Sequence, residues 1–267
     1  MERELMYGID AMWIAAALLV ALLLAIDGGF RLGRRRERAE SAPAKAHLNA
    51  IQASMLGILA LLLGFTFSSA LERFEARSQA VVAEANAIGT AWQRAGLLPA
   101  AHQREARAAL RDYLDTRIVA NGLATDHYDG IDAMRVRTSA AQARLWETAL
   151  RAAAADPHPV TTGLYAESIN AVVDAYVLRN AALDRHVPEV VLFLLMATFL
   201  MVGLVIGFAM GVAGVRHSLA SHLMVALIAF LVFIILDLDR PRRGMVLVDQ
   251  GSLIALRAEI GRQDRTD

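Results

Sequence analysis

The fold is decided by residues 50–92, which read AIQASMLGILALLLGFTFSSALERFEARSQAVVAEANAIGTAW. The opening stretch, residues 50–67, is apolar enough and long enough to cross the hydrocarbon core of a bilayer as a helix. Charged side chains return after it, but apolar residues keep recurring at helical spacing, and no proline or glycine interrupts the chain between Phe65 and Gly89. We therefore expect one unbroken helix that leaves the membrane and continues into water.

Three further apolar runs have the length of membrane spans. They are residues 9–26, residues 190–212, and residues 223–236 together with the four residues before them. Because the backbone must satisfy its own hydrogen bonds in lipid, all four runs are expected to be helices. Four such runs in one chain favour a membrane protein over a soluble helical bundle. The first run is expected to be retained, because arginines follow it where a signal peptide would have a small-residue cleavage site.

The overall composition agrees with this class and excludes several others. Of the 267 residues, 56% are hydrophobic and 20% are charged, and 27 basic residues balance 27 acidic ones. A chain with a formal net charge of +0 has no basic field, and binding to nucleic acid is not expected. The absence of cysteine excludes a disulfide framework, a thiolate metal site and a cysteine nucleophile.

The long segment between the second and third spans has helical periodicity throughout. We expect it to form an antiparallel bundle of four amphipathic helices outside the bilayer. The first is the continuation of the second span and ends at Pro99; the others end near Gly122, at the DPHP sequence of residues 156–159, and at Pro188. In the tail, MVLV at residues 245–248 suggests a short strand, followed by a last amphipathic helix.

The predicted class is an all-α membrane protein with four transmembrane helices and a membrane-attached antiparallel bundle between spans 2 and 3. Its predicted organisation is residues 1–70 with two spans and a basic loop, 71–187 with the bundle, 188–238 with two spans, and 239–267 as a tail with a short helix.

The short connections predict the orientation in the membrane. Arginines gather after the first run, at residues 31–38, and Arg216 lies between the third and fourth runs. Under the positive-inside rule both connections are cytoplasmic. The N-terminus, the bundle and the C-terminal tail would then lie outside the cytoplasm, with the chain in a bacterial inner membrane. Three arginines within residues 240–243 follow the fourth run directly and argue for the opposite orientation.

The sequence contains no HExxH, Walker, GxSxG or GxGxxG motif, and its seven histidines are scattered. We therefore expect no catalytic residues, no metal site and no cofactor. An enzyme is the least favoured class, and only the DxD pair of Asp237 and Asp239 would support it.

That pair belongs to DLDRPRRG, residues 237–244, the densest polar motif of the chain. Its charged members lie where the fourth span ends: Asp237, Asp239, Arg240, Arg242 and Arg243. They could hold an ion or ligand, or the carboxylates could pair with nearby arginines and fix the tail. The structural role is the favoured interpretation.

Glycines in two spans predict close helix packing. Gly203, Gly207 and Gly211 share one face of the third span at a spacing of four. In the second span, Gly57 and Gly64 each follow an alanine by four residues. Small residues let helix backbones approach closely, so these faces are expected to meet protein, from the same chain or another copy.

The second span also carries residues that could line a pore. A pore needs hydroxyls and an apolar constriction, and this helix supplies both with Ser54, Phe67, Ser68, Leu71 and Phe74. The alternative is that the hydroxyls bond back to their own helix and the phenylalanines lie in the core.

Two segments resemble a known family. Residues 61–99, LLLGFTFSSALERFEARSQAVVAEANAIGTAWQRAGLLP, and residues 236–244, LDLDRPRRG, are similar to the markers of the bacterial bestrophin-like membrane proteins. The resemblance implies a homo-oligomer, with a pentamer favoured, and a central anion-conducting pore lined by the second helix. The constriction would fall at Phe67, Leu71 and Phe74. Bestrophins place the large domain in the cytoplasm, opposite to the side that the arginines of residues 31–38 predict.

The sequence is compatible with two functions of different kinds. The favoured one is an oligomeric channel for small ions, with the lipid bilayer and further copies of the chain as partners. The alternative is a membrane sensor or scaffold whose bundle detects a ligand or the state of the envelope and signals through partner proteins.

Overall fold

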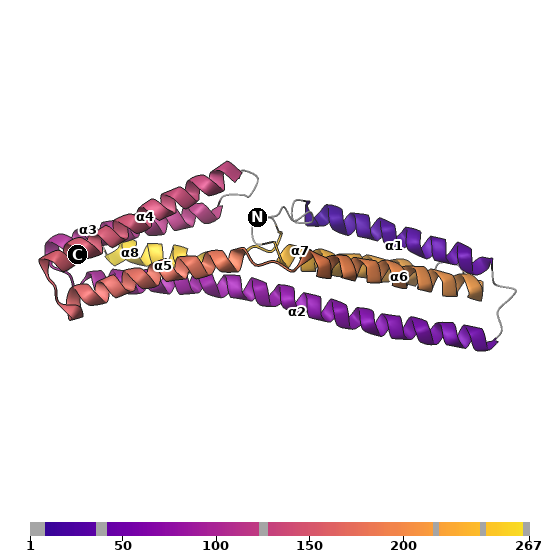
Figure 1. Cartoon of the computed structure of the whole chain (residues 1–267). Helices are drawn as coiled ribbons and strands as arrows, with labels where there is room; N and C mark the ends of the chain where they lie inside the picture. Colours follow the sequence, from indigo (N-terminus) through magenta and orange to yellow (C-terminus); the bar gives the residue numbers. More distant parts are fainter. Residues whose placement is uncertain (1–8, 36–41, 123–127, 216–218, 241–243, 264–267) are drawn as a thin grey trace. The chain divides into compact units, whose positions relative to one another are not determined.

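The chain is described by a computed structural model that covers residues 9–35, 42–122, 128–215, 219–240 and 244–263 (Figure 1). These residues form helices α1 (Ala11–Arg34), α2 (Ala42–Ala95), α3 (Ala100–Gly122), α4 (Tyr128–Ala155), the short π-helical segment η1 (Pro159–Gly163), α5 (Leu164–Leu183), α6 (Glu189–Ala213), α7 (Leu219–Leu238) and α8 (Gly251–Gln263). The predicted all-α class is confirmed.

The short strand predicted at residues 245–248 is wrong. Neither a helix nor a strand is assigned to these residues. The backbone N–H groups of Met245 and Val246 donate instead to the carboxylate of Asp237, at 2.8 and 2.9 Å. A strand needs those donors for a partner strand, and here a side chain has taken them.

Four helices are long and apolar enough to cross a membrane, namely α1, α2, α6 and α7. They coincide with the four predicted runs. Asp10 caps the start of α1, where its carboxylate accepts a hydrogen bond from Met12 N at 2.9 Å. Gly214 ends α6 with a φ of 70°, a conformation that favours glycine.

Helix α2 is the unbroken helix that the sequence predicts. It runs for 54 residues, which at 1.5 Å per residue is about 80 Å. Its first part is apolar, and its last turns are amphipathic. The helix ends at Ala95, before the turn that leads to Pro99.

The chain divides into two compact units, and α2 contributes to both. Within the described residues, one unit comprises 9–35, 42–73, 186–215, 219–240 and 244–246, and we call it the membrane unit. The other comprises 74–122, 128–185 and 247–263, and we call it the bundle unit.

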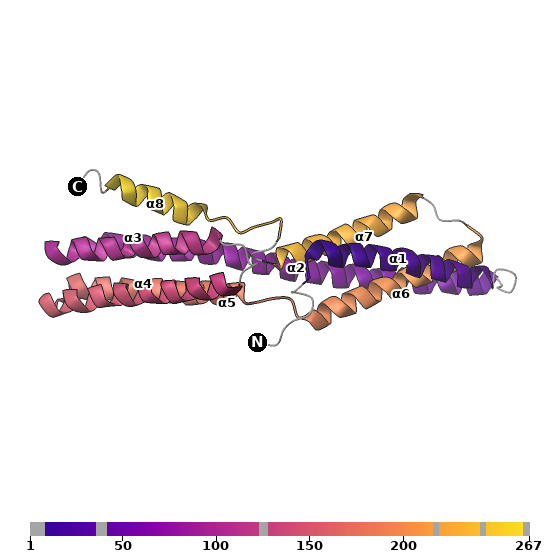
Figure 2. The ribbon, with the colours of Figure 1, turned by 90° about the horizontal axis from the view of Figure 1, so that it is seen from above.

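Inside the membrane unit, α1 packs against α6 and α7 (Figure 2). The contact with α6 depends on glycines from both helices. A Cβ added at Gly207 or Gly211 would lie 2.0 or 2.3 Å from a carbonyl oxygen of α1, and one added at Gly29 or Gly33 would lie 2.1 or 2.2 Å from a carbonyl oxygen of α6. The two backbones are therefore in direct contact, an approach that only glycine permits.

Inside the bundle unit, α3 packs against α4 and α8, and α4 packs against α5. Because short connections join consecutive helices, α3, α4 and α5 run antiparallel. The core is formed by apolar residues from these helices and from the last turns of α2, and α8 adds Leu253 and Ile260. The large members, such as Ile88, Leu110 and Leu145, are fully buried.

Candidate functional site: the exposed face of α2

One face of α2 in the membrane unit is not covered by the residues that the structure describes. Of the 18 consecutive residues that form the most apolar part of α2, 11% are buried. The corresponding share is 39% in α6 and in α7. The covered side carries Leu59, Thr66 and Ala70, which are buried at intervals of seven and four residues. The opposite side is therefore available to a partner or to a water-filled path.

The exposed side of α2 carries both small and large apolar residues. The small ones are Ala50, Ala53, Ser54, Gly57, Ala60, Gly64 and Ser68, and the large ones include Ile51, Ile58, Leu61 and Phe65. A Cβ added at Gly57 or Gly64 would meet nothing within 4 Å. The packing that the sequence predicts for these two glycines thus has no partner among the described residues of the same chain.

The five predicted pore residues lie on or beside this exposed side. Ser54 and Ser68 are exposed, Phe67 and Leu71 are each 37% exposed, and Phe74 is half-buried. The hydroxyl of Ser54 donates to Ala50 O at 3.0 Å, within the same helix. The Ser68 hydroxyl donates to the carboxylate of Glu72 at 3.4 Å.

Carboxylates follow the apolar part of this face. Glu72 and Glu75 are exposed on the same side of α2. The nearest arginines of the helix are engaged elsewhere. Arg73 donates to the backbone and hydroxyl oxygens of Ser69, at 3.3 and 2.7 Å, and Arg77 is buried with 1% exposure. The exposed face therefore changes from apolar to acidic within two helical turns.

Of the packing glycines in α6, Gly207 and Gly211 meet the backbone of α1, as described above. Gly203 lies on the same face, and a Cβ there would be 3.3 Å from a methyl carbon of Leu22. The partners in α1, Gly29 and Gly33, were not identified from the sequence. Their own spacing of four was the signal that could have revealed them.

The two carboxylates of the charge cluster are engaged with backbone groups of the membrane unit. Asp237 accepts from the N–H groups that follow Gly244, at 2.8 and 2.9 Å. Asp239 accepts from Val187 N at 2.8 Å, just before α6 begins. Arg240 is buried beside them with 5% exposure. Arg242 and Arg243 lie outside the described residues.

The hydrogen bonds of Asp237 and Asp239 hold two backbone segments in place. Asp237 fixes the turn after α7, where a Cβ at Gly244 would lie 2.7 Å from the carbonyl oxygen of Asp237. Asp239 fixes the entry to α6. Among the described residues, no group of three histidine or acidic side chains could hold a metal ion.

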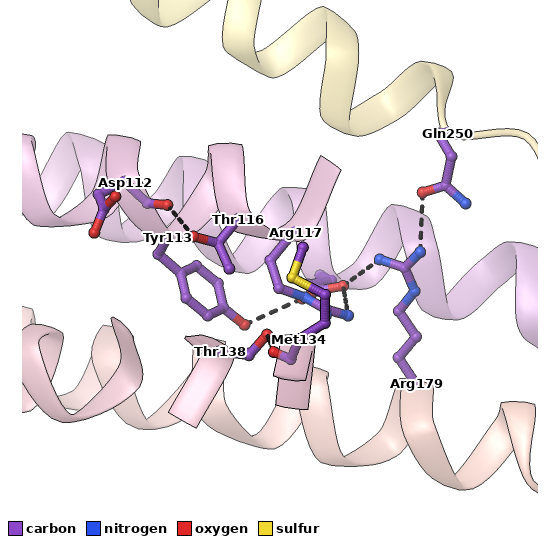
Figure 3. Close-up of polar contacts among 9 residues, drawn as sticks. Asp112, Tyr113, Thr116, Arg117, Met134, Thr138, Arg179 and Gln250 are labelled. Carbon is purple, nitrogen blue, oxygen red and sulfur yellow. Dashed lines mark hydrogen bonds and ion pairs between the residues drawn. The ribbon is translucent and has the colours of Figure 1, made fainter. Parts of the chain in front are cut away.

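The bundle unit contains a buried ionic network (Figure 3). The carboxylate of Glu84 has no exposure, and it accepts from Arg117 Nε at 2.6 Å, from Arg179 Nη1 at 2.5 Å and from the Tyr113 hydroxyl at 3.1 Å. Arg179 also donates to the side chain of Gln250 at 2.9 Å, just before α8. The network thus joins α2, α3, α5 and the start of the tail helix.

Burial and charge set the ionisation of this network. Burial is the largest cause that raises the pKa of Tyr113 above its ordinary range, and the nearby Glu84 carboxylate raises it further. Burial acts to lower the pKa of Arg117, but the same carboxylate outweighs it and raises that pKa. The tyrosine therefore stays neutral and the arginine charged, as structural ion pairs require.

Sequence reasoning missed this network, although a signal was present. Glu84, Arg117 and Arg179 each lie on the apolar side of an amphipathic helix, among residues that are buried. A charge on the apolar side of a helix must find a partner, because burying an isolated charge is costly. The partners themselves, 33 and 95 residues away from Glu84, could not be identified from spacing.

The fold and this face define a class: a multi-pass helical membrane protein with a membrane-attached helical bundle. A family model described as the bestrophin-like domain matches residues 14–253. Since this is most of the chain, the protein belongs to the bestrophin-like family. Among curated protein sequences, none is a significant match.

Solved structures share the fold. Two variants of a bacterial bestrophin homologue from Klebsiella pneumoniae match with TM-scores of 0.62 and 0.60, at 17% and 16% identity. The alignments cover 92% and 94% of this chain and 95% and 96% of those chains. A crystal structure of a membrane protein matches with a TM-score of 0.58 at 17% identity, over 92% of this chain and 96% of that one.

Proposed function

We propose that the chain forms a homo-oligomeric ion channel in which the exposed face of α2 from each copy lines the pore. The main support is the exposure of that face in a member of the bestrophin-like family. The apolar part of α2 is less buried than the apolar parts of α6 and α7. Copies of α2 arranged around an axis would cover it. The family resemblance favours five copies.

The residues on this face suit a narrow pore. Small side chains let neighbouring copies of α2 approach closely, and the exposed hydroxyls of Ser54 and Ser68 offer hydrogen bonds to ions or water. Phe67 and Leu71, with Phe74 at the flank, would supply the apolar constriction. Gly57 and Gly64 would lie at contacts between copies.

The alternative function is a sensor or scaffold that signals through partner proteins. The observation that favours it is the continuity of α2, which belongs to both units without a break. A rigid helix could transmit a change in the bundle unit to the membrane unit. A chain with this function would not transport ions.

The channel is tested by stoichiometry and by flux. The purified chain should form an oligomer of defined size, five copies being favoured, as measured by native mass spectrometry. Reconstituted in liposomes, it should let external ions enter and change the fluorescence of a trapped ion indicator. A monomer without flux would contradict the proposal.

The constriction is tested by Phe67→Ala. Removing the ring should lower the apolar barrier and raise ion flux roughly tenfold, the effect of a barrier change of about 1.4 kcal/mol. The matched control is Phe193→Ala on α6, where the ring is also exposed, at 50%. Equal effects of the two variants would argue against a constriction at Phe67.

Two features of the chain predict opposite charges for the permeant ion. The family resemblance favours anions, whereas exposed carboxylates at Glu72 and Glu75 would attract cations to the same face. Replacing both with glutamine should shift the reversal potential in a KCl gradient towards that of chloride. A reversal potential that does not move would remove these side chains from the conduction path.

The orientation is proposed from the arginines of residues 31–38: the N-terminus, the bundle unit and the tail would lie outside the cytoplasm, in a bacterial inner membrane. Because the chain has no cysteine, single cysteines at Ser139 and Val215, both exposed, give a direct test. A membrane-impermeant thiol reagent applied to intact spheroplasts should label only position 139. Labelling only at position 215 would reverse the orientation.

A further inference from the structure

A small cavity lies between α1 and α7, inside the membrane unit. It has a volume of about 190 Å³, and its lining is formed by Leu23, Ile26, Asp27, Ser221, His222 and Val225. The position along the chain is informative. Asp27 directly follows the apolar run of residues 9–26, and Ser221 and His222 lie in the first turns of α7. The cavity therefore lies where both helices leave the hydrocarbon, at the depth of lipid headgroups.

The polar part of the lining is formed by Asp27, Ser221 and His222, and Arg31 lies beside it as the ion-pair partner of Asp27. Asp27 Oδ2 lies 2.8 Å from Arg31 Nη2, one turn further along α1. Both side chains are accessible, at 43% and 75% exposure, so the pair can also bind a third group. An exposed pair at this spacing stabilises a helix only slightly.

The other end of the cavity is apolar. Ile26 and Val225 are buried and form its base, while Leu23 is partly exposed at its side. A second cavity, of about 530 Å³, is lined by apolar residues of α1 and α6 alone, including Leu24, Leu200 and Leu204. Unlike that apolar cavity, the cavity at Asp27 has one polar end and one apolar end. An amphiphilic molecule would fit it, with the polar headgroup at Asp27 and the hydrocarbon chain along Leu23.

We propose that this cavity binds a membrane phospholipid whose headgroup carries both a phosphate and a primary ammonium, as in phosphatidylethanolamine. The Asp27 carboxylate would accept hydrogen bonds from the ammonium. The phosphate would accept them from Arg31. Charge-assisted bonds of this kind are the strong ones. A quaternary ammonium has no N–H to donate, so choline lipids would bind more weakly.

The test is native mass spectrometry of the full-length chain, titrated with dioleoyl phosphatidylethanolamine, phosphatidylcholine or phosphatidylglycerol. The chain should bind the ethanolamine lipid about tenfold more tightly than the choline lipid, as expected for one charge-assisted hydrogen bond. In Asp27→Asn that preference should disappear. In Arg31→Gln all three lipids should bind more weakly, because the phosphate they share loses its partner.

The matched control is Asp132→Asn, which removes a carboxylate from another exposed pair, with Arg135 in the bundle unit. This variant should keep the full preference. Equal binding of the three lipids by the unaltered chain would overturn the proposal, and so would a preference that survives Asp27→Asn. If a cysteine at position 222 cross-links to a second copy in the purified oligomer, the cavity is a subunit contact, which also overturns the proposal. None of these readouts depends on ion conduction.

Discussion

The membrane unit and the bundle unit solve the same packing problem in different ways. In the membrane unit, α1 and α6 meet through glycines, and backbone touches backbone at Gly29, Gly33, Gly207 and Gly211. Both units bury large apolar side chains, but in the bundle unit it is a buried glutamate with two arginines, and not a glycine contact, that joins the helices. The solvent explains the difference. Lipid offers no hydrophobic gain for burying a leucine, so close contact must hold the helices, whereas in water apolar burial supplies the main driving force.

The comparison also teaches where each unit is vulnerable. When an atom is added to a core of large side chains, those side chains can move and accommodate part of it. A Cβ added at Gly207 would lie 2.0 Å from a backbone oxygen, which cannot move without shifting the helix. A buried carboxylate with two cationic partners cannot be neutralised without leaving charge uncompensated. The sensitive points are therefore glycines in one unit and an ionic network in the other.

The largest expected effect is that of Glu84→Gln in the bundle unit. The variant would leave Arg117 and Arg179 buried without their anion, and breaking a buried ion pair in this way costs about 3–5 kcal/mol. Thermal unfolding of the detergent-solubilised protein should show a strongly lowered midpoint. The matched control is Asp112→Asn, which breaks an exposed pair with Arg144, joined at 2.6 Å, and should cost less than about 1 kcal/mol.

A smaller effect is expected from Gly207→Ala in the membrane unit. The added methyl group would collide with the carbonyl oxygen of Ile26, and overpacking of this kind costs about 1–3 kcal/mol. The control is Gly28→Ala, one position from the contact, where a Cβ meets nothing within 4 Å. That variant should be neutral or slightly stabilising, because alanine favours the helix. If both variants melted alike, the backbone contact would not be what holds α1 to α6.

The smallest effect is expected from Asp237→Asn, at the end of α7. Asparagine keeps one acceptor oxygen but replaces the other by an amide, so one of the two bonds to residues 245 and 246 is lost. The expected loss of stability is about 1.5 kcal/mol, the contribution of one hydrogen bond to a charged group. Hydrogen exchange at Met245 and Val246 should speed up, while the amides inside α8 should change little. An unchanged exchange rate at both residues would contradict this role.

Much of the architecture could be predicted because it depends on local chemistry. The four apolar runs and the stretch without proline or glycine between Phe65 and Gly89 identify the spans and the continuous α2. The DPHP sequence correctly separates α4 from the helix that follows. Each of these features depends on neighbouring residues, and periodicity and helix breakers report them directly.

What could not be predicted depends on contacts between distant segments. The partners of Gly207 and of Glu84 belong to other helices, and the spacing of residues within one helix does not identify them. The MVLV segment has strand-like composition, yet the Asp237 carboxylate takes its N–H groups, a tertiary contact that overrides local preference. The pore-lining role of α2 stays a prediction, because it involves copies of the chain that one sequence does not describe.

The glycine contact between α1 and α6 has a consequence for biosynthesis. Gly29 and Gly207 lie 178 residues apart in the sequence. At a synthesis rate of roughly 5–20 residues per second, α1 must wait about 10–40 s in the bilayer before α6 emerges from the ribosome. During that time its glycine ridge faces lipid or a chaperone, and a chain truncated before α6 would keep the ridge uncovered. Membrane quality-control proteases would then have an unpaired helix by which to recognise unfinished copies.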